Sequence, residues 1–251
     1  MKNKFPRKKQ VIDSPTEVQT LRLNRFIAKS GLCSRREADE LIKSGKISVN
    51  GELITKMGFQ VKRSDVVTHK GRKLLPEKYV YVLLNKPKDF ITTTKDPQNR
   101  KTVMDLVAKA GNQRIFPVGR LDRNTTGLLL LTNNGELAKK LTHPSHKVPK
   151  IYQIVLNKPL TANDLEMIKK GIELEDGKAI VDQIEVLNTK KEIGLEIHMG
   201  KNRIVRRLFE HLGYSVEKLD RVTYANLTKK DLPRGKWRHL EGKEVVLLNR
   251  F

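Results

Sequence analysis

The residues best suited to chemistry lie in one segment, Gly-Arg-Leu-Asp-Arg-Asn-Thr-Thr-Gly, at positions 119–127. Asp122 stands between Arg120 and Arg123, and the segment runs into four leucines, Leu128 to Leu131. A short apolar run closed by a polar turn is typical of a buried strand. A carboxylate at the mouth of such a strand, between two cations, is expected to stay ionised and to face a polyanion. Asp122 is therefore a candidate nucleophile or base.

The same spacing admits a second interpretation. An Asp that caps its own turn and pairs with the neighbouring arginines has the same sequence pattern, because ion pairs are common and are rarely catalytic. The segment alone favours neither interpretation.

Composition restricts the partners of the chain. Its 251 residues carry 51 Lys+Arg against 28 Asp+Glu, a formal charge of +23, which predicts salt-dependent attraction to phosphate backbones. No apolar run is long enough to span a membrane, and residues 1–10 carry five basic residues without the apolar core of a secretory signal. A single cysteine and six histidines without ligand spacing predict no metal site and no disulfide. We expect a cytoplasmic protein that binds nucleic acid.

The chain divides into an arm and two domains. Residues 1–20 are expected to form a flexible basic arm, 21–69 a compact module, 70–78 a charged linker and 79–251 a second domain. Within the module, two helices are predicted near residues 21–28 and 35–43, the second capped by Ser34 with Glu37. A strand at 47–49, an Asn50-Gly51 turn and a strand at 61–68 follow.

The second domain has more predicted strands than helices. Strands are expected at 79–84, 128–131, 151–156, 179–187, 193–199 and 244–248, and helices at 102–109, after Thr161 and at 204–212. Strands and helices do not alternate one for one, which favours an α+β fold with a mixed, largely antiparallel sheet.

The module resembles the small RNA-binding domain named after ribosomal protein S-four. The resemblance is carried by Leu-Arg-Leu-Asn-Arg-Phe-Ile-Ala at 21–28, Gly-Leu-Cys-Ser-Arg-Arg-Glu-Ala at 31–38 and Gly-Lys-Ile-Ser-Val-Asn-Gly at 45–51. It implies that Arg35, Arg36 and Lys43 contact RNA phosphates, which supply affinity and register but no sequence choice.

The second domain resembles the RsuA/RluB type of ribosomal RNA pseudouridine synthases, and within it the RluB-like large-subunit branch. Four blocks carry the resemblance: residues 84–88, 118–133, 150–152 and 200–209. The resemblance implies that uridine in ribosomal RNA is isomerised to pseudouridine. That reaction moves the sugar bond from ring nitrogen 1 to ring carbon 5 without redox change, so no cofactor is expected.

The resemblance also assigns roles to residues. Asp122 is the catalytic acid, and it either attacks the sugar or abstracts a sugar proton. Arg206 is its expected partner in a closed pocket, and Tyr152 is the aromatic ring on the flipped base. Arg120 is expected to fill the space that the base leaves. Phosphate contacts are expected for the remaining matching cations, Lys86, Lys201, Arg203 and Arg207. From the residues alone, the alternative for Tyr152 is a core side chain of an alternating strand. The alternative for Arg203 and Arg207 is the solvated face of an amphipathic helix, and for the lysines it is a solvated surface.

Two positions depart from the family pattern, and other functions compete with this one. Ile204 stands where many members of the wider superfamily carry glutamine, and Asp89 where glycine is commoner. The competing functions are a small-subunit RNA target, a non-catalytic ribosome-assembly factor and a DNA-binding protein. We expect a monomer whose partner is ribosomal RNA or a pre-ribosomal particle.

Overall fold

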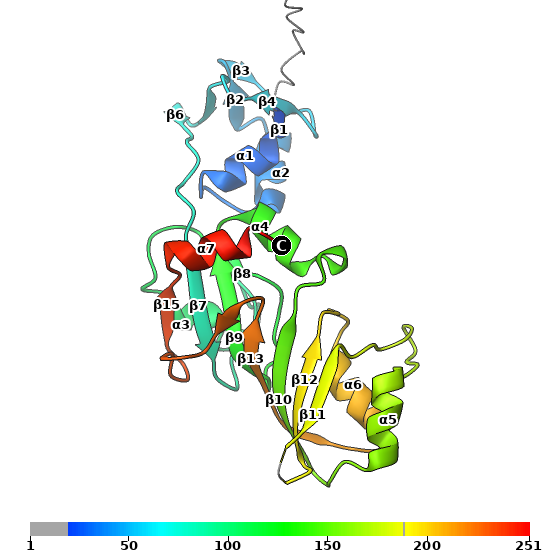
Figure 1. The fold of residues 1–251 in the computed structure, drawn as a ribbon. Coiled ribbons are helices and arrows are strands. Elements are labelled where there is room, and N and C mark those ends of the chain that lie inside the picture. Colours follow the sequence, from blue (N-terminus) through cyan, green and yellow to red (C-terminus); the bar gives the residue numbers. More distant parts are fainter. Residues whose placement is uncertain (1–19, 188) are drawn as a thin grey trace, which may run out of the picture. The chain divides into compact units, whose positions relative to one another are not determined.

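The computed structural model describes residues 20–187 and 189–251, in two units that meet between Pro76 and Glu77. Except for Thr20, the arm expected at residues 1–20 lies outside the described residues. Figure 1 shows the helices and strands of each unit.

The first unit contains two short helices and small antiparallel strands. Its core is formed by the apolar faces of the two helices and by strand residues such as Ile47 and Val67. Ser34 caps the second helix: its hydroxyl accepts a hydrogen bond from the Glu37 N–H, and the Glu37 carboxylate accepts one from the Ser34 N–H, as predicted. In chain order the elements are β1 (Thr20–Arg22), α1 (Leu23–Lys29), α2 (Arg35–Lys43), β2 (Ile47–Val49), β3 (Glu52–Leu53), β4 (Gln60–Lys62), β5 (Val67–His69) and β6 (Arg72–Lys73).

Two details of this unit differ from the prediction. The single strand expected at 61–68 is interrupted and forms β4 and β5, which belong to different sheets. Part of the expected linker at 70–78 is ordered, because β6 pairs with β5 through a turn at Lys70 and Gly71, both with positive φ. The residues read as a charged linker therefore complete a hairpin of the first unit.

The second unit is built on one mixed sheet. Its main strand order is β11-β12-β10-β13-β9-β7-β15, and every pairing is antiparallel except that of β13 with β9. The predicted fold class is confirmed. The strands are β7 (Tyr81–Lys86), β8 (Phe116–Pro117), β9 (Thr126–Thr132), β10 (Lys150–Leu156), β11 (Gln183–Val186), β12 (Glu192–Ile197), β13 (Val216–Tyr224), β14 (Leu227–Thr228) and β15 (Trp237–His239). The helices are α3 (Val103–Leu106), α4 (Gly135–Thr142), the 3₁₀ turn η1 (Pro144–His146), α5 (Ala162–Lys170), α6 (Ile204–His211) and α7 (Gly242–Leu248).

The strand predicted at 244–248 is wrong, because those residues lie in α7. Glu241 and Glu244 form a capping box at its start, and the Val245 N–H donates to the Glu241 carbonyl oxygen. The Val-Val-Leu-Leu run suggests a strand, but the capping interactions and burial of Leu248 favour a helix. Strand β13, the longest of the sheet, was not predicted because its residues alternate less regularly.

The four leucines of β9 explain why this strand is buried on both sides. Leu128 and Leu130 pack into one core with residues of α4, and Leu129 and Leu131 pack into another with residues of α3. Successive side chains of a strand point to opposite faces, so an uninterrupted leucine run fits a strand between two cores. The loop that precedes β9 is thereby attached to the most buried strand of the unit.

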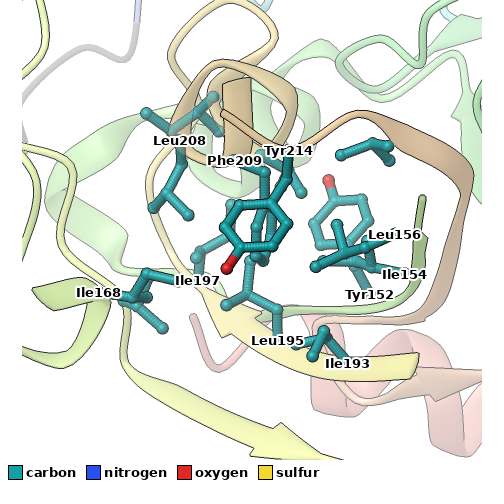
Figure 2. Close-up of a cluster of buried hydrophobic side chains, with 14 of the residues drawn as sticks. Tyr152, Ile154, Leu156, Ile168, Ile193, Leu195, Ile197, Leu208, Phe209 and Tyr214 are labelled. Carbon is teal, nitrogen blue, oxygen red and sulfur yellow. The ribbon is translucent and has the colours of Figure 1, made fainter. Parts of the chain in front are cut away.

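A third core lies where helices α5 and α6 cover strands β10 and β12. Figure 2 shows Tyr152 beside Ile154 and Leu156 of β10, with Phe209 of α6 in the same cluster. This packing orients β10, and with it the first three residues of the strand, Lys150 to Tyr152.

Candidate active site

A buried lysine holds the loop that carries Asp122, residues 119–125, through hydrogen bonds to its backbone. Lys86, at the end of β7, has no exposed surface. Its Nζ donates to the carbonyl oxygens of Asp122 at 3.0 Å, Arg123 at 3.3 Å and Thr125 at 2.9 Å, and to that of Pro87 at 3.1 Å. The predicted phosphate contact of Lys86 is therefore wrong: the ammonium group faces the underside of the Asp122 loop and is out of reach of RNA.

Burial lowers the pKa of Lys86 to about 8, while the charges of Asp122 and Asp89 act in the opposite direction. An ammonium group withdrawn from water needs compensating acceptors, and the four carbonyl oxygens supply them. The buried charge thus favours the backbone conformation that presents Asp122.

The loop has two further attachments. The Thr92 hydroxyl donates to the Leu121 carbonyl oxygen at 2.8 Å, and the Asp89 N–H donates to the Arg123 carbonyl oxygen at 2.9 Å. Asp89 has φ of +68°, a region that favours glycine, which accounts for the glycine common at this position in the family pattern. The Asp89 carboxylate accepts from Arg123 Nε at 3.2 Å, so this departure adds a contact to the loop.

The Asp122 side chain opens into a cavity of about 170 Å³, hereafter the active-site cavity. Among the described residues that line it, Asp122 is the one acid, against six cations. Its wall comes from the Asp122 loop, the starts of β10 and α6, and β13. The lining cations are Arg120, Lys150, Lys201, Arg203, Arg206 and Arg221. A single carboxylate surrounded by cations suits a reaction on a polyanion.

The ion pair of Asp122 differs from the prediction. The Asp122 side chain is 41% exposed, and its nearest cation is Arg203, whose Nη1 lies 3.9 Å from Asp122 Oδ2. Arg206 instead donates from Nη1 to the Val216 carbonyl oxygen at 2.8 Å. Burial, and after it the charge of Arg203, lowers the pKa of Arg206, and the charge of Asp122 opposes this shift. The expected closed, buried Asp122–Arg206 pair is not formed.

Two cations predicted to bind phosphate are held by the protein. Arg207 forms a bidentate pair with Asp176, both N–O distances being 2.9 Å, and its Nε donates to the Asn202 carbonyl oxygen. Lys201 donates to the carbonyl oxygens of Asp176 and Gly177 at 2.6 and 2.7 Å. These contacts fix the turn before α6, which begins after Arg203, a residue at φ +46°.

The other predicted site residues occupy compatible positions. Tyr152 is 8% exposed and serves both as a member of the α5–α6 core and as a wall of the active-site cavity. Arg120 is exposed at the rim. In the first unit, Arg35, Arg36 and Lys43 are exposed residues of α2.

Sequence reasoning missed two basic residues of the cavity. Lys150, at the start of β10, donates from Nζ to the carbonyl oxygens of Val148 at 3.0 Å and His198 at 2.6 Å. Burial lowers its pKa to about 8, assisted by the charge of Arg221. Arg221 lies in β13 and is 3% exposed. Lys150 belongs to the family block at residues 150–152, but the resemblance assigns it no role. Arg221 lies in β13, a strand that the sequence pattern does not predict, so only the register of β13 reveals it.

No group of three or more His, Cys, Asp or Glu side chains is placed to hold a metal ion within residues 20–187 and 189–251. In the same part of the chain, no helix combines the length and apolarity needed to cross a membrane.

Comparison with known proteins agrees with both units. Residues 80–211 match the RNA pseudouridylate synthase family, and residues 21–67 match the S4 domain. The chain is 43% identical to ribosomal large subunit pseudouridine synthase B of Bacillus subtilis, over 90% of this chain and 95% of the relative. It is 36% identical to the dual-specificity RNA pseudouridine synthase RluF of Escherichia coli K12, over 90% and 78%.

A solved crystal structure of a pseudouridylate synthase superposes with a TM-score of 0.65 at 28% identity, covering 91% of this chain and 99% of the other. The chain therefore belongs to the RNA pseudouridylate synthase family and is a pseudouridine synthase with an amino-terminal S4 domain.

Proposed function

We propose that this enzyme converts a uridine of large-subunit ribosomal RNA to pseudouridine, with Asp122 as the catalytic carboxylate. The observation that carries the proposal is the position of Asp122: it is the one acid among the described residues lining a cavity with six cations. The large-subunit target is supported by the 43% identity to a relative named as a large-subunit enzyme.

The reaction begins with the sugar of a uridine that has left its stack. The carboxylate either forms a bond to sugar carbon 1 or removes a sugar proton, and in both routes the base departs with the electrons of the broken bond. The Asp122 loop places the carboxylate without help from the substrate, because Lys86 and Thr92 hold its backbone. Such advance placement of the reacting group is what lowers the barrier.

The surrounding residues bind and orient the RNA. Arg120, exposed at the rim, fills the vacated position in the stack, and Tyr152 lies against the flipped base. Arg203 and Arg206 hold the charge of Asp122, at contact and at longer range respectively. In the S4 domain, Arg35, Arg36 and Lys43 bind phosphates and increase affinity for the RNA.

The enzyme acts as a monomer in the cytoplasm, on ribosomal RNA or on a pre-ribosomal particle. Its own side chains supply every group used here, and the isomerisation consumes no second substrate.

Tritium release from large-subunit ribosomal RNA labelled at uridine carbon 5 tests the proposal. The wild-type protein should release tritium, and Asp122→Asn should reduce the rate by at least about 10⁴-fold, because the amide neither attacks nor accepts a proton. Asp231→Asn, the same change at an exposed acid outside the lining of the cavity, should retain activity. Release from small-subunit RNA alone would contradict the large-subunit target. Equal release by Asp122→Asn would contradict the role of the carboxylate.

A further inference from the structure

Two residues that line the active-site cavity each carry a buried polar atom without a hydrogen-bond partner among the described residues. Five buried side-chain nitrogen or oxygen atoms lack a hydrogen bond among the described residues, and two of them, Arg221 Nη2 and Thr125 Oγ1, belong to residues that line this cavity. Buried polar groups are nearly always bonded, so two exceptions in one cavity need an explanation.

The Arg221 guanidinium is rigidly held on its other sides. Its Nε donates to the Leu128 carbonyl oxygen at 2.8 Å, and its Cζ lies 4.6 Å from the centre of the Tyr224 ring. The residue is 3% exposed, so neither bulk water nor the backbone of a docked RNA reaches it from outside. The position of Nη2 is thus set before a substrate enters.

The backbone around Arg221 is equally constrained. Arg221 is the register partner of both Tyr152 in β10 and Gly127 in β9. A Cβ on Gly127 would lie 2.3 Å from the Arg221 carbonyl oxygen, and Gly127 has φ of +107°. Thr125 stands two residues before Gly127, and its carbonyl oxygen is bound by Lys86. Arg221 is therefore located between the strand of Tyr152 and the loop of Asp122.

The reaction generates a negative charge that such a donor suits. When the bond between sugar carbon 1 and ring nitrogen 1 breaks, both electrons stay with uracil, whose charge spreads over nitrogen 1 and the two carbonyl oxygens. Carbon 5 then bonds to sugar carbon 1, while the carboxylate either leaves that carbon or returns the sugar proton that it removed. The carbon 5 proton leaves, and nitrogen 1 takes up a proton. The detached base is thus an anion inside the cavity.

We propose that Arg221 is a catalytic residue whose Nη2 donates to a carbonyl oxygen of the uracil ring and stabilises the detached anion, with Thr125 Oγ1 as a second hydrogen-bonding group to the base. This rests on the proposed isomerisation. A preorganised donor at a developing charge is the arrangement that lowers a transition state most effectively. The same contact distinguishes uracil from cytosine when it is made at ring position 4, where cytosine carries an amino group in place of an acceptor.

A combined change of enzyme and substrate tests the contact. Three transcripts of large-subunit RNA are prepared, with ordinary uridine, 2-thiouridine or 4-thiouridine, and conversion is followed by chromatography of the digested nucleosides under single-turnover conditions. Sulfur is a poor hydrogen-bond acceptor. The wild-type enzyme should convert one of the two thio transcripts about tenfold more slowly than the ordinary transcript.

The variants Arg221→Lys and Arg221→Gln should be slower on ordinary RNA, by about 10²- to 10³-fold for the glutamine, with the same affinity for RNA. With the thio transcript that slows the wild type, these variants should be no slower than with ordinary RNA, because they already lack the contact between Arg221 and the base. Any effect of sulfur on RNA folding is the same for every enzyme and cancels in the comparison. Arg206→Lys is the matched control: it changes another arginine of the cavity and should retain the tenfold thio effect. Thr125→Val should reduce the conversion rate, and the tenfold thio effect that depends on Arg221 should remain.

Two results would overturn the assignment. One is an equal thio effect in wild type and in the Arg221 variants, which is what a merely structural bond to Leu128 predicts. The other is a wild-type enzyme that is insensitive to sulfur at both positions, which needs no variant to fold. Failure of the proposed function is distinguishable, because wild-type enzyme would then not convert the ordinary transcript.

Discussion

The two units of this protein place arginine and lysine side chains in opposite environments. In the S4 domain, Arg35, Arg36 and Lys43 project from α2 into solvent. In the catalytic unit, Lys86 and Arg221 are buried, and each is bonded to backbone carbonyl oxygens. Exposed cations attract RNA from a distance and are screened by salt, whereas buried ones hold a loop or a reacting atom in place. We propose that burial, and not residue type, separates the cations that give affinity from those that serve catalysis.

The largest effect on stability is expected at Gly127, because only a residue without a side chain fits beside the backbone of Arg221. Gly127→Ala places a methyl group 2.3 Å from the Arg221 carbonyl oxygen at a φ of +107°. The parallel pairing of β9 with β13 should open, and the protein should unfold or lose several kcal/mol of stability. Gly51→Ala, at φ +92° with nothing near its Cβ, is the control for backbone strain alone. Thermal melting of both variants tests this. Equal melting temperatures would contradict the close approach of the backbones at Gly127 and Arg221.

Lys86→Met removes the ammonium group that donates to four carbonyl oxygens at the Asp122 loop, and those of Pro87 and Thr125 lose the one donor described for them here. We expect a loss of about 3 kcal/mol in stability and about 10²-fold in single-turnover rate, because the carboxylate is no longer held in position. Lys88→Met, the same change at an exposed position two residues later, should have neither effect. Equal stability and equal single-turnover rate in the two variants would contradict a role of Lys86 in holding the Asp122 loop.

The buried lysines should also give stability an unusual pH dependence. The pKa values of Lys86 and Lys150 are lowered by burial to about 8, against roughly 10.4 in an unfolded chain. Between these values the unfolded chain binds more protons than the folded one, so the free energy of unfolding rises with pH, by at most about 1.4 kcal/mol per pH unit for each lysine. Urea unfolding from pH 8 to 10 measures the slope. Lys86→Met should reduce it, and an unchanged slope would exclude a contribution from this residue.

The smallest effect on chemistry is expected from the exposed cations. Replacing Arg35, Arg36 and Lys43 together with glutamine should weaken RNA binding about tenfold at moderate salt and leave the rate at saturating RNA unchanged. The slope of log affinity against log salt should decrease by roughly 2, since each phosphate contact contributes about 0.7–0.9. Filter binding across a salt series tests this. A slope equal to that of wild type would remove these residues from the RNA interface.

The sequence predicted the parts of the structure that depend on local pattern. The capping box of α2, the buried strand β9 and the largely antiparallel sheet follow from side-chain periodicity and caps, and comparison with known proteins confirms the family. The helix at 242–248 contains an apolar run that resembles a strand, and the local signal for a helix is the capping box of Glu241 and Glu244.

The partners of individual cations were harder to predict. Lys86 and Lys201 belong to family blocks beside the site, and each was expected to bind phosphate. Their hydrogen bonds to carbonyl oxygens depend on loops that fold back from distant parts of the chain. Likewise, Arg203 contacts Asp122 in place of Arg206 because α6 begins after Arg203, and the Arg206 guanidinium is turned toward Val216. Such pairings are properties of the tertiary fold and leave no local signal.

The division between buried and exposed cations is tested most directly by measuring dissociation constant and saturating single-turnover rate on one RNA. The RNA is large-subunit ribosomal RNA, and the variants are Lys86→Met and the triple glutamine variant of α2. The account predicts a slower rate with unchanged affinity for Lys86→Met, and weaker affinity with unchanged rate for the triple variant. A Lys86→Met enzyme that regains the wild-type rate at saturating RNA would contradict it.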